Sequence, residues 1–492
     1  MALMADKQAR PLREFLLKRN CFTQIEAFPQ KDDLTDRVFW DAKLSTCIYI
    51  IRKSPPFTFM VRIHPGKEIF DGSPIKINYD QIKEFDKENL SIPCYPKMTD
   101  RDFLLALNLI RICKENVLGN YASSQQGEVN LTTHKEFLSE EPNGQIVLRG
   151  AHVDRYELQE EAKQGTPMYL DVPKFLSQHD IHTKAYDHRY IRIGYQRGAA
   201  IDNWKRIIAT IISEGNFCSD TINYIINPHQ LDLFFVLSLL NSSLWEWRFR
   251  LTSTNNHVNA YEIDSMPIPF ISFVAPEEKR KNLIEEVKNH YKKYLETGKP
   301  DHILYFIESR LRKEYQPDPE LVKKHNSDPL NKDWQIPEGA LWEQTDVVHD
   351  VLAYLAEQMI EMNKEKQVET KGLLKWLEAQ LKIQSNADGD TGIEAFTGKT
   401  QIKNYLGDYQ KGEDHLPFEE FWKILGKNKT RIQANLKSRE LFATINTEFQ
   451  KSLSKLFPLK ERMRKTDWLI DQIVYKLYDL TEEEIKIVEV HK

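Results

Sequence analysis

Arginine and glutamine alternate with apolar residues in the segment Tyr190–Arg197. Successive side chains of an extended strand point to opposite faces, so Arg192 and Gln196 share one face, and Ile191 and Ile193 lie on the other. Arginine can pair with guanine through two hydrogen bonds, and glutamine can pair with adenine in the same way. The segment therefore predicts a strand whose polar face reads base edges. The alternative for each residue is an ordinary solvated side chain.

Other cations and amides flank this segment in the sequence. Phosphate contacts position a protein on a duplex without reading its sequence, and lysine and arginine supply most of them. The four cations that we expect in this role are Arg149, Arg155, Lys205 and Arg206. Asn255-Asn256-His257 is predicted to be a polar loop that reaches base edges. A solvated surface position again remains the alternative for each of them.

The elements that would position these residues fall into three stretches. Residues 1–95 alternate short apolar strands (Phe22–Phe28, Thr46–Arg52 and Phe57–Ile63) with proline- and glycine-containing breaks. At Thr99 a Thr-x-x-Asp capping pattern begins a helix, which we expect to end at Gly119.

The second and third stretches differ in their pattern. From about 120 to 270 strands, helices and loops are mixed, and we expect one long apolar helix over Leu231–Phe249. Beyond 276, apolar residues recur at helical spacing, with charges on the opposite face. The sequence therefore predicts an α+β protein with domains at 1–95, 96–275 and 276–492, the last of them helical.

Composition narrows the class of protein. The 492 residues carry a formal net charge of −5, with 41% hydrophobic and 29% charged residues, which is ordinary for a soluble globular protein. A negative total counts against nucleic-acid binding, but the local potential of a groove matters more than the sum. No apolar run approaches the length of a membrane span, and no signal sequence is visible. The five cysteines form no CxxC pair, so we expect a cytoplasmic protein without a zinc site or disulfides, and no other metal site.

Several stretches resemble one enzyme family. The start of the sequence resembles the last elements of the catalytic domain of TaqI-like adenine-N6 DNA methyltransferases of the type IIG restriction-modification kind. The matching stretches are Leu12–Leu17, Phe22–Phe28, Val38–Ala42 and Ser45–Lys53. Three further matches follow in the family's order: Gln126–Asn130 with Val147–Tyr156, Leu239–Ser242 with Met266–Pro269, and Leu477–Ile485.

The resemblance implies a division of labour. In the family a catalytic domain flips an adenine out of the duplex and methylates it, and a target-recognition domain reads the site. The family's glycine-rich cofactor loop and Asn-Pro-Pro-Tyr loop precede the first matching stretch. We therefore expect 1–95 to be an incomplete remnant of the α/β methyltransferase sheet, and 96–275 to be the recognition domain. The resemblance gives Phe39 the role of stacking on the flipped base; the alternative is that Phe39 packs its hairpin.

One segment supports the alternative that this chain is itself an active enzyme. Ser54-Pro55-Pro56-Phe57 follows a strand and resembles the family's catalytic loop, whose side-chain and backbone oxygens hold the target amine. The loop requires a partner strand with a Phe-x-Gly-x-Gly cofactor turn, and the sequence contains none. We expect no S-adenosylmethionine site in this chain unless a partner completes it.

Three functional hypotheses follow. The leading one is a module that binds a specific double-stranded DNA site and needs a separate chain, carrying the missing methyltransferase motifs, for catalysis. The second is an active, diverged adenine methyltransferase that uses Ser54–Phe57. The third is a truncated gene product.

Overall fold

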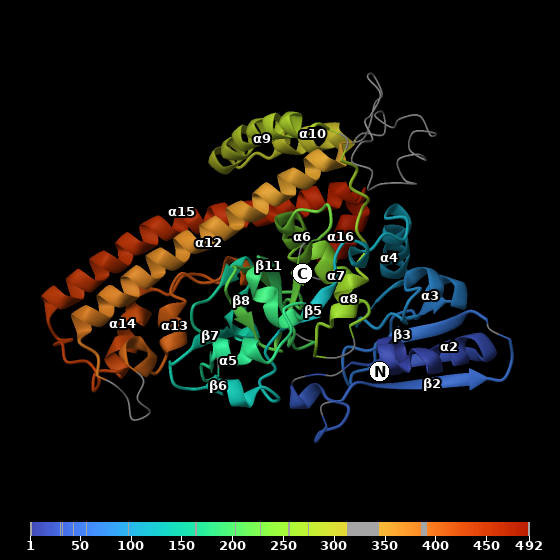
Figure 1. Cartoon of the computed structure of the whole chain (residues 1–492), viewed down its shortest axis with the longest axis horizontal. Coiled ribbons are helices and arrows are strands. Elements are labelled where there is room, and N and C mark those ends of the chain that lie inside the picture. Colours follow the sequence, from blue (N-terminus) through green and yellow to red (C-terminus); the bar gives the residue numbers. More distant parts are fainter. Residues whose placement is uncertain are drawn as a thin grey trace. The chain divides into compact units, whose positions relative to one another are not determined.

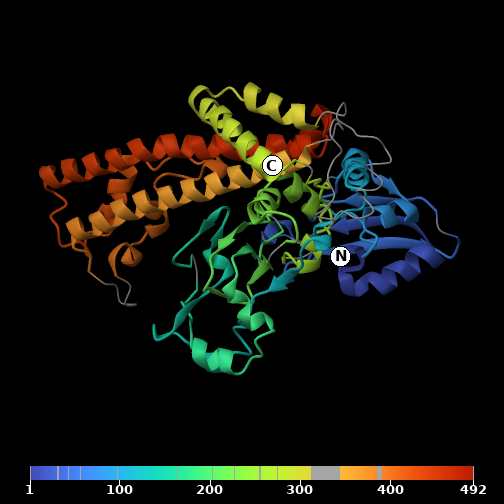
Figure 2. The same cartoon turned by 45° about the horizontal axis from the view of Figure 1, so that its top comes forward.

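The structure, a computed structural model, describes residues 2–311, 344–384 and 391–490, apart from 30, 32, 43, 56, 97, 163–164, 202, 227, 254–255 and 274. The chain divides into two compact units. The first contains Met1–Tyr291, Asp301–Ala356 and Ile470–Lys492, and the second contains Lys292–Pro300 and Glu357–Leu469. The first unit thus holds both segments that the sequence predicts as separate domains, 1–95 and 96–275. Helices and several small sheets coexist, so the predicted α+β class is confirmed (Figures 1 and 2).

The first sheet of unit 1 has four strands in the order β2-β1-β3-β4. Its strands are β1 (Cys21–Phe28), β2 (Thr46–Arg52), β3 (Phe59–Ile63) and β4 (Ile75–Ile77). β1 is parallel to β3 and antiparallel to β2. Ile25, Val61 and Ile75 align across the sheet and are completely buried. The neighbouring helices are α1 (Ala2–Ala5), α2 (Arg10–Arg19), α3 (Tyr79–Phe85) and α4 (Asp100–Ile112).

The helix α4 begins as predicted and ends early. The side chain of Thr99 accepts from the backbone of Asp102, and Asp102 bonds back to Thr99, which completes the capping box. The helix ends at Ile112 and does not reach Gly119, because Lys114 and Glu115 adopt positive φ angles of 51° and 60°.

The middle of unit 1 contains two further four-stranded sheets and a two-stranded one. The sheet β12-β11-β14-β5 consists of Ala209–Ile212, Arg192–Gln196, Ile222–Ile226 and Ser124–Gln126. The sheet β13-β7-β10-β6 consists of Phe217–Cys218, Gln145–Leu148, Tyr169–Leu170 and Leu138–Ser139, and β8 (Val153–Asp154) pairs with β9 (Glu157–Leu158). A cluster of buried residues joins these layers: Leu148, Val153, Ile212, Cys218, Ile222 and Tyr224.

The helices of this region are α5 (Val172–Ser177), α6 (Leu233–Leu240), α7 (Ser243–Arg250) and α8 (Ala260–Asp264). The single apolar helix expected over Leu231–Phe249 is wrong, because it is broken into α6 and α7. Ser242 caps α7 by accepting from the backbone of Trp245, and the Ser243 N–H donates to Asp471 at 2.7 Å. These polar contacts compete with a continuous helix.

Long helices dominate the rest of the chain, as predicted for residues beyond 276. They are α9 (Glu277–Thr297), α10 (Asp301–Leu311), α12 (Thr345–Leu381), α13 (Lys399–Lys403), α14 (Phe418–Lys427), α15 (Arg439–Leu477) and α16 (Glu482–Val490). In unit 2, α12 and α15 run side by side and are joined by ion pairs such as Lys455–Glu369 at 2.9 Å (Figures 1 and 2). Among the described residues, no helix has the length and apolarity required to cross a bilayer.

Candidate nucleic-acid interface

The predicted reading strand is β11, and it lies in the middle of its sheet. It pairs on one side with β12 and on the other with β14, antiparallel to both. Arg192 and Gln196 do share a face, as predicted. That face packs against Val153, Cys218 and their neighbours, and α6 packs near the other face, so four of the five residues of β11 are buried.

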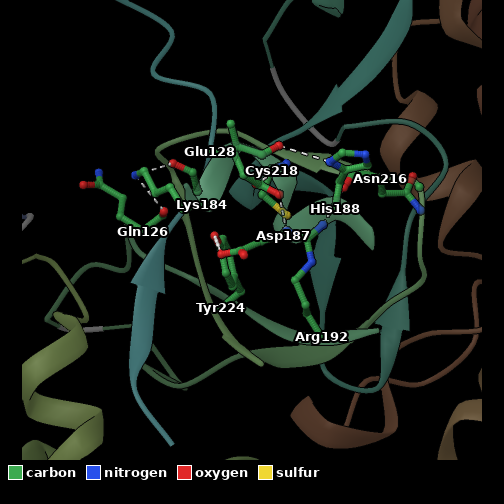
Figure 3. A network of polar contacts seen from close by, with 12 residues as sticks. Gln126, Glu128, Lys184, Asp187, His188, Arg192, Asn216, Cys218 and Tyr224 are labelled. Atoms are coloured by element: carbon green, nitrogen blue, oxygen red, sulfur yellow. Dashed lines mark hydrogen bonds and ion pairs between the residues drawn. The ribbon is translucent and has the colours of Figure 1, made fainter. Parts of the chain in front are cut away.

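Arg192 is held in a buried polar network (Figure 3). Its guanidinium is ion-paired with Glu128, and neither side chain has any exposed surface. It also donates to the Asn216 carbonyl and lies over the Tyr224 ring, 4.7 Å from the centroid. Glu128 accepts a second hydrogen bond from the Cys218 N–H at 2.9 Å. Burial raises the pKa of Glu128 above its ordinary value, and the arginine opposes this rise.

This network corrects the role predicted for Arg192. Base reading requires a guanidinium that can reach a groove, and this one has 0% exposure with its donors directed inward. The alternation of polar and apolar residues identified the correct shared face. It did not show that a second layer covers that face and supplies a carboxylate.

Gln196 and Asn256 also have partners inside the protein. The Gln196 side-chain amide donates to the Val153 carbonyl at 2.6 Å and is half-buried. Asn256 accepts from the Ile201 N–H through its side chain at 3.1 Å, and its carbonyl accepts from Ala199. Both side chains therefore hold loops in place. Asn255 lies outside the described residues.

Three of the four predicted phosphate contacts are buried as well. Arg155 is 6% exposed and donates to the Asn241 carbonyl at 2.5 Å. Lys205 is 8% exposed. Arg206 is 1% exposed, lies over the Phe249 ring, and has its pKa lowered to about 10 by burial. Like Arg192, Arg155 and Arg206 are expected from the sequence to be surface groups. Their hydrogen-bond partners lie far away in the sequence.

The remaining candidate is Arg149, which is half-buried and donates to the Thr166 carbonyl at 2.9 Å at an exposed position. The prediction missed exposed cations of this region, among them Lys184 and Arg189 at the ends of the 3-10 helix Lys184–Arg189. Lys184 donates to the carbonyls of Gln126 and Gly127 (Figure 3), and Arg189 lies over the Tyr186 ring at 4.4 Å. A cation at each end of an aromatic-containing turn is the only sequence signal for this pair.

The aromatic residue expected to stack on a flipped base lies in the loop between β1 and β2. Phe39 is 51% exposed and Trp40 is 73% exposed. With Val38, Asp41, Ala42 and Leu44 they line an open hollow of about 490 Å³. Phe39 therefore does not pack into a hairpin core, and its ring is accessible.

The Ser54–Phe57 segment follows β2 directly. The Ser54 N–H donates to the Arg52 carbonyl at 2.9 Å, and Phe57 is 74% exposed; Pro56 lies outside the described residues. The crevice beside Phe57 is too narrow for a water molecule. Residues 1–95 contain only two glycines, Gly66 and Gly72, and neither lies in a turn from strand to helix. The described residues of this region therefore contain no glycine-bearing turn from strand to helix.

No group of three or more histidine, cysteine or carboxylate side chains suited to a metal ion occurs within the described part of the chain. Two histidines of the 179–188 segment, His179 and His188, pack on aromatic rings, and His182 is exposed. His188 stacks on Phe217 with ring centroids 4.3 Å apart, and His179 lies 4.4 Å from Phe175.

Comparison with known proteins gives structural neighbours only. No family of known proteins and no curated protein sequence matches this chain. Among solved structures, it is similar to the type IIG restriction endonuclease BpuSI, with 13% identity and a TM-score of 0.27 over 58% of this chain and 41% of that one. It is also similar to the type IIL restriction-modification enzyme MmeI in complex with DNA, with 11% identity and a TM-score of 0.30 over 70% of this chain and 46% of that one. This chain spans less than half of either protein, and TM-scores of this size define neither fold nor function.

Proposed function

We propose that this chain is the DNA-binding, target-recognition part of an adenine-specific DNA methyltransferase of a type IIG restriction-modification system. In this proposal a separate chain supplies the S-adenosylmethionine site and the catalytic loop, and the two together methylate a specific duplex site. The observation that carries the proposal is the open edge of the first sheet, in the region with the methyltransferase-like sequence.

β2 forms that edge, because among the described strands it pairs with β1 alone (Figure 1). Its middle residues are apolar and exposed: Ile48 by 63%, Tyr49 by 45% and Ile50 by 56%. Proteins usually protect an edge strand with charge, proline or a covering element, because its free N–H and carbonyl groups invite a further strand. Within the part of the chain that the structure describes, none of these protects the centre of β2, so it suits pairing with a strand of another domain.

The face of the sheet next to this edge supports the same proposal. Ile48 lies opposite Glu26, and Ile50 lies opposite Gln24, so both isoleucines share the less buried face. The central pair of this sheet, β1 and β3, is parallel, and all-parallel sheets have both faces covered. A partner that adds a strand to β2 and packs against this face would bury both isoleucines.

The DNA-binding part of the proposal rests on exposed groups. The loop with Phe39 and Trp40 precedes β2, so it would lie near a catalytic domain completed there. We assign phosphate contacts to Arg149, Lys184 and Arg189, which have solvent access, as do other cations of the 120–270 region such as Lys135 and Lys174. Reading of bases would fall to the loops around them, and not to β11.

Two measurements test this proposal. Fluorescence-anisotropy titrations of the full chain with duplexes selected from a random pool should show preference for one site. Arg149→Ala, Lys184→Ala and Arg189→Ala should each weaken binding to all duplexes. Calorimetry should show no binding of S-adenosylmethionine to the chain alone. If no duplex binds more tightly than about 10⁻⁴ M, the level of non-specific binding at physiological salt, the proposal fails.

A further inference from the structure

A concentrated run of positive charge in unit 2 extends from the end of α14 to the start of α15. From Gly426 to Arg439 the sequence contains five cations and no carboxylate, in a chain whose net charge is −5. We name residues 427–439 the basic loop; its cations are Lys427, Lys429, Arg431, Lys437 and Arg439. Four of them are exposed, and Arg431 is half-buried.

Uncharged groups hold the backbone of the basic loop in place. Asn428 is 3% exposed, and its side chain both donates to the Thr397 carbonyl and accepts from the Thr397 N–H, each at 2.9 Å. Ile432 is buried and forms a β-bridge with Ile383 after the end of α12. The Gln384 N–H donates to the Arg431 carbonyl at 2.8 Å. The backbone is thereby held while the cations on either side of Asn428 extend into solvent.

These cations differ from other surface lysines of the same unit. Lys364, Lys423 and Lys451 each have a glutamate three residues earlier, at 2.8, 2.6 and 3.3 Å respectively. Within the described residues, none of the five cations of the basic loop forms an ion pair. Residues 427–439 contain no carboxylate. Lys382, which is exposed at the end of α12, adds a further positive charge. The result is a surface with excess positive charge, to which the N-terminal end of the α15 dipole adds; the carboxylate of Glu440 follows in the first turn of α15.

We infer that the basic loop is a second DNA-contacting surface, which binds the phosphate backbone of a duplex without reading its sequence. This inference rests on the proposed function and extends it to a site in unit 2. Lysine and arginine neutralise phosphates and release their counterions, which is the main source of sequence-independent affinity for DNA. An interfacial membrane site would also present exposed apolar side chains. Here Ile432 is buried and Leu436 is half-buried, so the loop favours a polyanion over a lipid surface.

The test compares two triple variants of the full chain. Lys427→Ala/Lys429→Ala/Lys437→Ala removes three cations of the basic loop. Lys364→Ala/Lys423→Ala/Lys451→Ala removes three exposed lysines that are ion-paired, and serves as the matched control. Anisotropy titrations with the preferred duplex and with an unrelated duplex are made over a series of salt concentrations. Thermal melts by circular dichroism verify that both variants fold.

The plot of log affinity against log salt concentration should become less steep by about one unit per lost phosphate contact, so by about three units for the basic-loop variant. The ratio of affinities for the two duplexes should stay unchanged, and the control should keep the wild-type slope. If the basic-loop variant keeps the wild-type slope while wild type binds DNA, the inference fails and the proposed function stands. If wild type binds no duplex, both fail. Binding of wild type and of both variants to phosphatidylserine vesicles is measured by cosedimentation in parallel. If the basic-loop variant loses vesicle binding and keeps the wild-type salt slope for DNA, the surface is a membrane site and the inference is overturned.

Discussion

The guanidinium of Arg192 is ion-paired with the carboxylate of Glu128 in the interior of unit 1, and both side chains are fully buried. The two residues are 64 positions apart in the sequence. Their pairing joins the sheet that contains β11 to the layer that contains Cys218, whose N–H also donates to Glu128. A residue that the sequence suggested as a DNA reader is thus part of what holds two layers together.

Removing one member of this pair should destabilise the protein strongly. Arg192→Met should lower the free energy of unfolding by about 3–5 kcal/mol, because it leaves Glu128 as a buried carboxylate without its cation. The double variant Glu128→Gln/Arg192→Met should recover much of that loss, since no buried charge remains. Urea unfolding at pH 7 measures both effects.

The control for this pair is Arg189→Met on the adjacent 3-10 helix, where the side chain is exposed; a change within about 0.5 kcal/mol is expected. If Arg192→Met left stability unchanged and abolished the preference for one duplex, Arg192 would be a base-reading residue after all.

The free energy of unfolding should depend on pH through the titration of Glu262. This carboxyl is 8% exposed, and burial raises its pKa from 4.5 to about 7; it accepts from the Asn259 N–H at 2.9 Å. Because the folded state holds the proton more tightly than the unfolded state, its contribution to stability is full below pH 4.5 and is lost as pH rises to about 7. Glu262→Gln keeps an acceptor and cannot ionise.

The difference in unfolding free energy between Glu262→Gln and wild type should therefore shift in favour of the variant by up to about 3 kcal/mol between pH 5 and pH 8. Urea unfolding at one-unit intervals of pH measures this shift. The exposed Glu136→Gln should show a constant difference. A constant difference for Glu262→Gln as well would mean that this carboxyl is ionised across the range.

Three of the four strands of the first sheet were predictable, because their signals are short-range, and the short strand β4 (Ile75–Ile77) was not predicted. β2 has the predicted bounds Thr46–Arg52, and β1 differs by one residue at its start. The capping box at Thr99 marked the start of α4 correctly. Its end depended on positive φ angles at Lys114 and Glu115, for which neither residue type gives a signal.

The candidate site was far less predictable, because burial is set by pairing between distant segments. An alternating strand at the edge of a sheet and one in its centre can carry the same sequence pattern. Arg192, Arg155 and Arg206 each contact groups more than 50 residues away, and nothing near them in the sequence indicates those partners. The basic loop could have been found from its lack of acidic residues, because that signal is local.

The open edge of the first sheet should make the isolated chain prone to self-association. Ile48→Lys/Ile50→Lys should lower the fraction of dimers and larger species, because charge on an edge strand opposes further pairing. The melting temperature should stay nearly constant, since both isoleucines are exposed in the monomer. Sedimentation velocity at increasing protein concentration measures this effect.

The matched control replaces two other exposed isoleucines, Ile69 (65%) and Ile181 (54%), by lysine and should leave association as in wild type. Wild-type protein that stays monomeric at the highest concentration would show that the edge does not pair with itself, and would leave a strand from a different chain as its partner.

One phenol of the C-terminal part of unit 1 bridges two buried groups. The Tyr478 hydroxyl accepts from the Trp245 indole N–H at 2.7 Å and donates to the Pro267 carbonyl at 2.8 Å, with all three groups buried. Tyr478→Phe keeps the ring and removes both hydrogen bonds, so the indole N–H and the carbonyl lose a partner that water cannot replace. The expected loss in unfolding free energy is about 1–3 kcal/mol, measured by urea unfolding. Tyr190→Phe, at a position with 47% exposure, should change it by less than about 0.5 kcal/mol. Equal stability of the two variants would show that the segment after Ile470 is not held through this hydroxyl.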